Sequence, residues 1–71
     1  MTELQNKVYN ELLKIKDDGF KGYETAEVYS EWANIKISAN TLTALAKLGL
    51  LDKREPNKKY YGDKKSRYKI L

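Results

Sequence analysis

The sequence predicts an α+β fold in which three helices precede a C-terminal β-hairpin. Apolar residues recur at helical spacing as far as Leu48, and each helical stretch begins at a capping residue. After Gly49 the pattern changes to the alternation that is typical of strands. A chain of 71 residues is the size of one small domain, so we expect residues 1–71 to fold as a single unit.

The first helix is predicted over residues 3–18. Thr2 and Gln5 have the spacing of a capping box, in which each side chain accepts a hydrogen bond from the other residue's backbone N–H. Apolar residues at spacings of four, four and three form one stripe: Leu4, Val8, Leu12 and Ile15. Gly19 predicts the end of the helix, because glycine readily adopts the left-handed conformation found at many helix C-termini. We expect this helix to be structural.

Residues 19–24 predict a connector to a second helix over residues 25–33. The connector holds two glycines and two aromatic residues, so we expect a short extended segment with Phe20 or Tyr23 in the core. A threonine at the start of the second helix is a favourable N-cap. The apolar face of this helix is formed by Val28, Tyr29 and Trp32. We expect the Trp32 ring to be a core anchor.

A third helix is predicted over residues 38–48, ending at Gly49 as its C-cap residue. Its contribution to the core is Leu42, Leu45 and Ala46. Ser38 is the favoured N-cap. The alternative N-cap is Asn34, which would give a longer helix over residues 35–48.

The C-terminal part predicts a hairpin, or wing, over residues 50–70. Side chains alternate on both sides of a basic tract that contains several turn residues, so a two-stranded hairpin with a long basic tip is the economical interpretation. The alternative is a tight turn at Pro56 with a third short strand through Tyr60 and Tyr61.

The missing residue types narrow the chemistry. The chain has no cysteine and no histidine, which excludes disulfides and thiolate metal sites and removes the commonest general base. We therefore expect no enzyme activity, no metal and no cofactor, and we interpret the adjacent acids Asp17 and Asp18 as a solvated turn. There is no apolar run of membrane-spanning length and no signal-peptide pattern, so we expect a cytoplasmic or nucleoid-associated protein. Met1 and the hairpin ending favour a complete chain.

The net charge of +4 is distributed unevenly along the chain. Residues 1–46 carry five lysines and seven acids, whereas residues 47–71 carry nine basic residues and three acids. The C-terminal third is therefore strongly basic, and it also contains three tyrosines. A basic segment with interleaved aromatic residues favours a polyanion as the partner.

The order of helices and hairpin resembles the winged helix-turn-helix superfamily. Two runs carry the resemblance: Thr25-Ala26-Glu27-Val28 and Leu42-x-x-Leu45-x-x-Leu48-Gly49-Leu50-Leu51-Asp52-Lys53-Arg54. The second run is similar to the end of the recognition helix and the start of the wing in MarR-type and PadR-type regulators. The resemblance implies that the third helix enters the DNA major groove and the wing grips the adjacent backbone. The chain has no room for the additional dimerisation helices of those regulators.

The outer face of the third helix supplies the candidates for base contacts. If the leucines face the core, the outward residues are Asn40, Thr43, Ala44 and Lys47, with Thr41 at the margin. Short polar groups and a cation, without any acid, suit a helix that reads base edges. Asparagine pairs with adenine, threonine contacts a base edge or the thymine methyl, and lysine reaches guanine or phosphate.

Basic and hydroxyl residues around the wing supply the candidates for backbone contacts: Lys36, Ser38, Lys53, Arg54, Lys58, Lys59, Lys64, Lys65 and Arg67. Such side chains neutralise phosphates and add affinity but little sequence information. Our hypothesis is therefore a small double-stranded DNA-binding protein, such as a transcriptional regulator or a phage- or plasmid-type protein. It would act with a partner protein or as a homodimer, since one module covers a small interface. The alternatives are a protein-interaction module, and a single-stranded DNA or RNA binder that stacks bases on Tyr60 and Tyr61.

Overall fold

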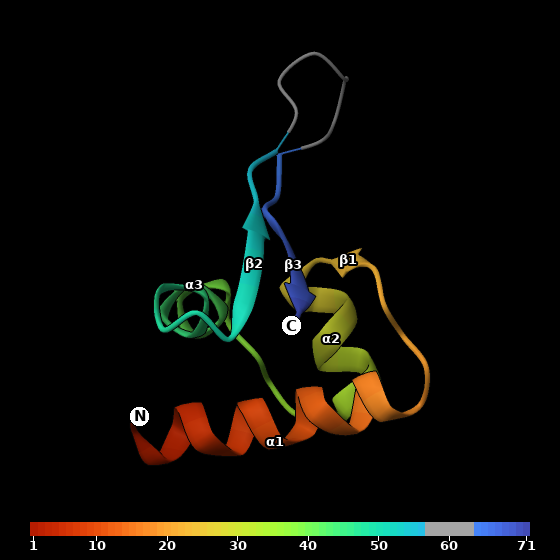
Figure 1. Ribbon diagram of the computed structural model, residues 1–71, viewed down its shortest axis with the longest axis vertical. Coiled ribbons are helices and arrows are strands. Elements are labelled where there is room, and N and C mark those ends of the chain that lie inside the picture. The colour runs from red at the N-terminus through yellow and green to blue at the C-terminus, as the bar shows by residue number, and fades with distance from the viewer. Residues whose placement is uncertain (57–63) are drawn as a thin grey trace.

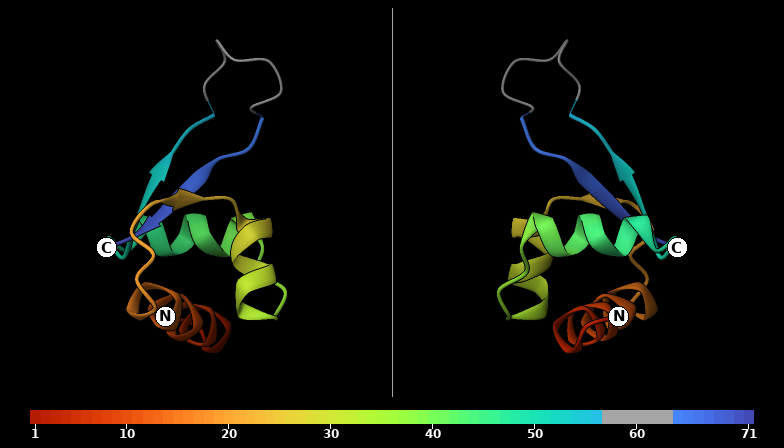
Figure 2. Two further views of the ribbon diagram at one scale, coloured as in Figure 1. Left: turned by 90° about the vertical axis from the view of Figure 1, so that its right-hand side faces the viewer. Right: turned by 90° about the vertical axis from the view of Figure 1, so that its left-hand side faces the viewer.

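The computed structural model describes residues 1–56 and 64–71, and these form an α+β fold of three helices and a three-stranded antiparallel sheet (Figure 1). The elements in chain order are α1 (Glu3–Asp17), β1 (Tyr23–Glu24), α2 (Ala26–Ala33), α3 (Ala39–Lys47), β2 (Leu51–Arg54) and β3 (Arg67–Ile70). The hairpin formed by β2 and β3 extends away from α1, and α2 and α3 lie between α1 and the hairpin (Figures 1 and 2).

The sheet is built around β3, with strand order β1-β3-β2. Lys53 of β2 lies opposite Tyr68, and Tyr23 of β1 lies opposite Lys69. The short extended segment predicted in the first connector is thus confirmed, and it supplies the third strand. The alternative third strand through Tyr60 and Tyr61 lies outside the described residues.

The helix starts follow the predicted N-caps, whereas the C-cap of α3 is Leu48 and the predicted Gly49 is the residue after it. The capping box at the start of α1 is formed, and Ser38 caps α3 by accepting the Thr41 N–H at 3.2 Å. The prediction of Ser38 over Asn34 is therefore confirmed, and Asn34 instead ends α2 in the left-handed conformation with φ 55°. Gly19 and Gly49 follow the ends of α1 and α3 with φ of 107° and 82°, where a side chain would strain the backbone.

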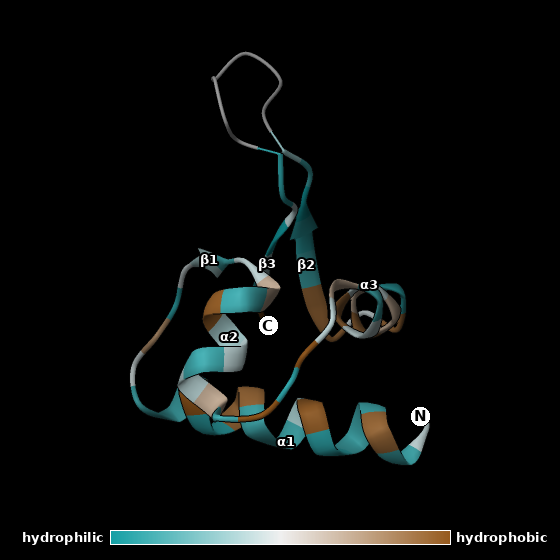
Figure 3. Ribbon diagram, turned by 180° about the vertical axis from the view of Figure 1, so that it is seen from behind, coloured by the Kyte–Doolittle hydropathy of each residue, from teal (hydrophilic) through white to brown (hydrophobic). Residues whose placement is uncertain are grey.

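The core lies between the helices and one face of the sheet. It consists of Val8, Leu12, Ile15, Tyr29, Ile37, Leu42, Leu45, Leu51, Tyr68 and Ile70. Figure 3 shows that β2 is hydrophobic at the end next to the core and hydrophilic at its other end. Most of the predicted core residues on α1 and α3 are therefore confirmed.

Two residues predicted in the core are exposed. Leu4 is 57% exposed, and the first buried residue of α1 is Val8, one turn later. Trp32 is 49% exposed, so the prediction of a core anchor was wrong. The side of α2 that faces the core is centred on Tyr29, which is completely buried, and Trp32 packs at the rim with its ring edge against Phe20.

Tyr29 connects α2 to the middle of the sheet. Its hydroxyl donates a hydrogen bond to the backbone carbonyl of Tyr68 at 2.5 Å. Burial, with a smaller contribution from the Glu24 carboxylate, raises the pKa of Tyr29 from 10.0 to about 12. The neutral phenol is therefore the form that the fold stabilises.

This pKa shift predicts a loss of stability at alkaline pH. The raised folded-state pKa favours folding below pH 10, and this contribution disappears as the pH rises from 10 to about 12. We expect a loss of about 2–3 kcal/mol in the free energy of unfolding. Urea unfolding followed by circular dichroism across this range measures it, with Tyr29→Phe as the control that lacks the titrating group. An equal alkaline loss in both proteins would contradict the prediction.

Candidate nucleic-acid interface

A groove of about 490 Å³ lies between the β2–β3 hairpin and the first turns of α2 and α3. We call it the hairpin groove. It is lined by Thr25, Ala26, Glu27, Ile37, Ala39, Asn40, Thr43, Lys53, Lys64, Lys65, Ser66 and Tyr68. Among the described residues the lining holds three lysines and one glutamate, so this part of it carries an excess of positive charge.

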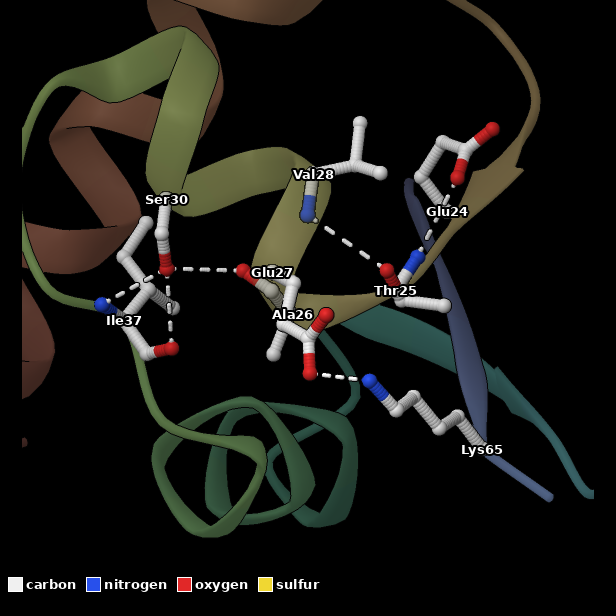
Figure 4. A network of polar contacts seen from close by, with 8 residues as sticks. All are labelled: Glu24, Thr25, Ala26, Glu27, Val28, Ser30, Ile37 and Lys65. Carbon is white, nitrogen blue, oxygen red and sulfur yellow. Dashed lines mark hydrogen bonds and ion pairs between the residues drawn. The ribbon is translucent and has the colours of Figure 1, made fainter.

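The turn between α2 and α3 places both helix starts at this groove. The Ser30 hydroxyl accepts the Ile37 N–H at 2.9 Å and donates to the Ala26 carbonyl at 2.7 Å (Figure 4). The Ile37 side chain is buried in the core, and this anchors the connection between α2 and α3. The hydroxyl thus fixes the chain just before Ser38, where α3 begins.

Asn40 and Lys47 are the exposed polar residues of the predicted recognition face. Asn40 lines the hairpin groove, and Lys47 lies two turns further along α3 on the same side. Ala44 is half-buried and borders a hollow between α3 and the start of α1. Thr41 is partly buried, and its hydroxyl lies 3.0 Å from that of Ser38 within the cap of α3.

The prediction that Thr43 points outward was wrong. Its hydroxyl lies 3.0 Å from the Tyr68 hydroxyl, which also donates to the Ala39 carbonyl at 3.3 Å. Thr43 therefore faces β3, because the sheet packs beside α3 on this side and offers a phenol as a partner. Its role in the structure is to hold α3 against the hairpin.

The alternation of the strands divides the basic residues of the hairpin between two faces. Lys53 lies on the same face of β2 as buried Leu51, opposite Tyr68, and so reaches the hairpin groove. Lys64 and Lys65 line the groove from the chain that leads into β3. These three lysines line the same groove as Ala39 and Asn40 at the start of α3.

Two predicted backbone contacts lie outside the hairpin groove. The Arg54 guanidinium lies over the Tyr23 ring at 4.7 Å, on the other face of the sheet, and Arg67 approaches Glu24 at 4.0 Å. On that face the Tyr23 hydroxyl donates to the Asp52 carboxylate, a hydrogen bond that raises the pKa of Tyr23. Both arginines therefore have partners within the sheet and do not converge with the groove lysines.

Of the remaining predicted backbone contacts, Lys36 and Ser38 do not line the hairpin groove. Lys36 is exposed in the turn between α2 and α3, and Ser38 is occupied as the N-cap of α3. Lys58 and Lys59 lie outside the described residues.

Sequence reasoning missed Glu27 in the first turn of α2. Its carboxylate forms an ion pair with the Lys65 ammonium, and Figure 4 shows the two side chains reaching toward each other from α2 and from the chain before β3. The residues are 38 positions apart, and no pattern in the sequence brings them together. An acid therefore borders the hairpin groove although α3 itself contains none.

The described part of the chain offers no group of acidic residues arranged to hold a metal ion. None of its helices combines the length and hydropathy that crossing a bilayer requires. Comparison of the sequence and fold with protein-family models, curated proteins and solved structures finds no match.

Proposed function

We propose that this chain is a winged-helix protein that binds double-stranded DNA. In this assignment α2 and α3 form the helix-turn-helix, and the β2–β3 hairpin is the wing. The observation that carries the proposal is the hairpin groove, which Lys53, Lys64 and Lys65 line together with the first residues of α3, a helix without acids. The third helix would enter the major groove while the wing follows the adjacent phosphate backbone.

In this proposal the lysines of the groove contact phosphates, and side chains of α3 contact bases. The lysines supply cations that neutralise phosphates and release counterions, which gives affinity for any sequence. Asn40 presents an exposed amide beside them, a group that pairs with the edge of adenine. Lys47, further along α3, carries a charge suited to guanine or phosphate. Asn40 and Lys47 are therefore the proposed reading residues, and Thr43 positions the helix that carries them.

A second candidate function is supported by the exposed apolar residues at the opposite end of α3. Met1, Leu4 and Leu48 are each more than half exposed, and two of them border a hollow of about 460 Å³ between the start of α1 and the end of α3. Apolar side chains gathered in this way favour contact with another protein. The hollow is also lined by Ala44 and Lys47 of the predicted recognition face, so a protein bound there would be an alternative to base contacts from Lys47.

The test is fluorescence anisotropy with a random-sequence 20-base-pair duplex and the matched single strand across a salt series. We expect preference for the duplex, with log affinity falling against log salt at a slope of about −3 to −5. Preference for the single strand would favour base stacking on Tyr60 and Tyr61, which lie outside the described residues. Absence of binding to both at low salt would overturn the proposal and leave the apolar end of α3 as the surface to test.

Substitution of Asn40 separates reading from phosphate contact. On a duplex selected for tight binding, we expect Asn40→Ala to weaken affinity by about tenfold, because one side chain–base pair contributes about 1–3 kcal/mol of discrimination. On random duplex the same variant should bind nearly as well as the unmodified protein, with the same salt slope. Equal losses on both duplexes would contradict a reading role. Thr43→Val is the matched control, because it disturbs the contact of α3 with Tyr68 without removing a proposed base contact. Thermal unfolding of the two variants then shows whether a loss of affinity comes from disturbance of α3.

A further inference from the structure

Glu27 is an unexpected acid at the edge of a groove whose other described charged residues are lysines. Its side chain is 72% exposed, and it is the one acidic residue among the described residues that line the hairpin groove. A carboxylate in this place repels phosphate. It also occupies Lys65, whose ammonium would otherwise be available to a polyanion.

We propose that Glu27 limits the affinity of the hairpin groove for nucleic acid by competing with phosphate for Lys65. This inference rests on the proposed DNA-binding function and deepens it. The ion pair joins α2 to the chain just before β3, so it spans the groove from one wall to the other. A phosphate that approaches Lys65 therefore meets the Glu27 carboxylate beside it, which repels the phosphate and competes for the ammonium.

The same reasoning distinguishes Lys65 from the other lysines of the groove. Lys53 pairs with Glu55 at 3.5 Å, but Glu55 is its close neighbour on the hairpin and does not line the groove. The acid that meets Lys65 comes from a different wall and faces the ligand. Weakening the sequence-independent phosphate contacts in this way increases the share of binding that depends on base contacts from α3.

The stability of the fold does not require this ion pair. Both side chains are more than half exposed, and pairs of this kind contribute little to folding. Glu27 also lies in the first turn of α2, where a negative charge favours the helix. If stabilising the helix were the only role of Glu27, its replacement would change thermal unfolding slightly and would leave the salt dependence of DNA binding unchanged.

The experiment compares Glu27→Gln with the original protein by anisotropy on the random-sequence duplex across the salt series. Release of Lys65 adds one phosphate contact, so we expect a salt slope steeper by about 0.9 and binding about fivefold to tenfold tighter at 0.1 M salt. Lys65→Gln should have little effect alone but should remove the gain when combined with Glu27→Gln. Asp17→Asn is the matched control, because it makes the same change in charge at an exposed residue of α1 that does not line the groove.

The outcomes separate this inference from the proposed function. If the original protein binds and Glu27→Gln behaves like Asp17→Asn, the inference is overturned and the DNA-binding proposal stands. If neither the original protein nor Glu27→Gln binds at low salt, both are overturned. A gain in Glu27→Gln that persists after Lys65→Gln would also overturn the competition for Lys65, since the gain would then come from net charge alone.

Discussion

Replacing Lys53 and Lys64 together by glutamine is expected to weaken binding to random-sequence duplex by about 50-fold at 0.1 M salt. Each phosphate contact contributes about 0.9 to the slope of log affinity against log salt, so the slope should become shallower by about two. Both residues line the hairpin groove beside α3, whereas Arg54 and Arg67 are not among its lining residues and contact Tyr23 and Glu24 of β1. Anisotropy across the salt series measures both quantities.

The control for this prediction is the double variant Lys7→Gln and Lys16→Gln. It removes the same number of charges from exposed positions on α1, on the side of the molecule opposite the hairpin (Figure 1). If binding depends on the hairpin groove, this variant should retain most of the affinity. Equal losses in the two double variants would mean that net charge, and not the groove, determines the affinity.

The sequence predicted the elements of the fold well because their ends are determined by local chemistry. Gly19 and Gly49 end helices through their own backbone freedom, and Ser38 caps α3 through a hydrogen bond to a residue three positions away. Interactions of this range can be read from a single sequence. The extended segment expected in the first connector is also present as β1. Its pairing with β3 joins residues far apart in the chain, so the sequence did not predict the pairing.

The errors concern side chains whose surroundings come from distant segments. Trp32 and Tyr29 both lie on the apolar side of α2, and only the arrangement of α1 and β3 decides that Tyr29 is buried and Trp32 is at the rim. Thr43 was placed on the outer face from the period of α3 alone. The helical period determines the direction of a side chain but not whether a strand packs there.

The candidate site also depends on contacts between segments that are distant in the sequence. The excess of basic residues after residue 46 predicted a cationic hairpin, but it did not separate Lys53 from Arg54, which lie on opposite faces of β2. Glu27 could not be found at all, because its importance depends on an ion pair with a residue 38 positions away. Composition predicts the sign of the charge on a surface, whereas the arrangement of that charge requires the fold.

Tyr68 is the residue whose loss we expect to damage the fold most. It lies on the central strand with 1% of its surface exposed, and its hydroxyl connects the sheet to α3 through Thr43 and the Ala39 carbonyl. Its own backbone carbonyl accepts the Tyr29 hydroxyl from α2. One residue therefore joins both helices of the proposed helix-turn-helix to the proposed wing.

Tyr68→Ala is expected to lower the free energy of unfolding by about 3–5 kcal/mol, because it leaves a cavity the size of an aromatic ring. A domain of this length has a total stability of about 4–10 kcal/mol, so the substitution should remove a large part of it and lower Tm far more than any surface change. Tyr68→Phe keeps the ring and loses the hydroxyl contacts, which should cost about 1 kcal/mol and lower Tm by about 4–8 °C. Thermal unfolding by circular dichroism measures both variants. If Tyr68→Phe were as unstable as Tyr68→Ala, the hydroxyl contacts to α3 and not the packing of the ring would hold the sheet in place.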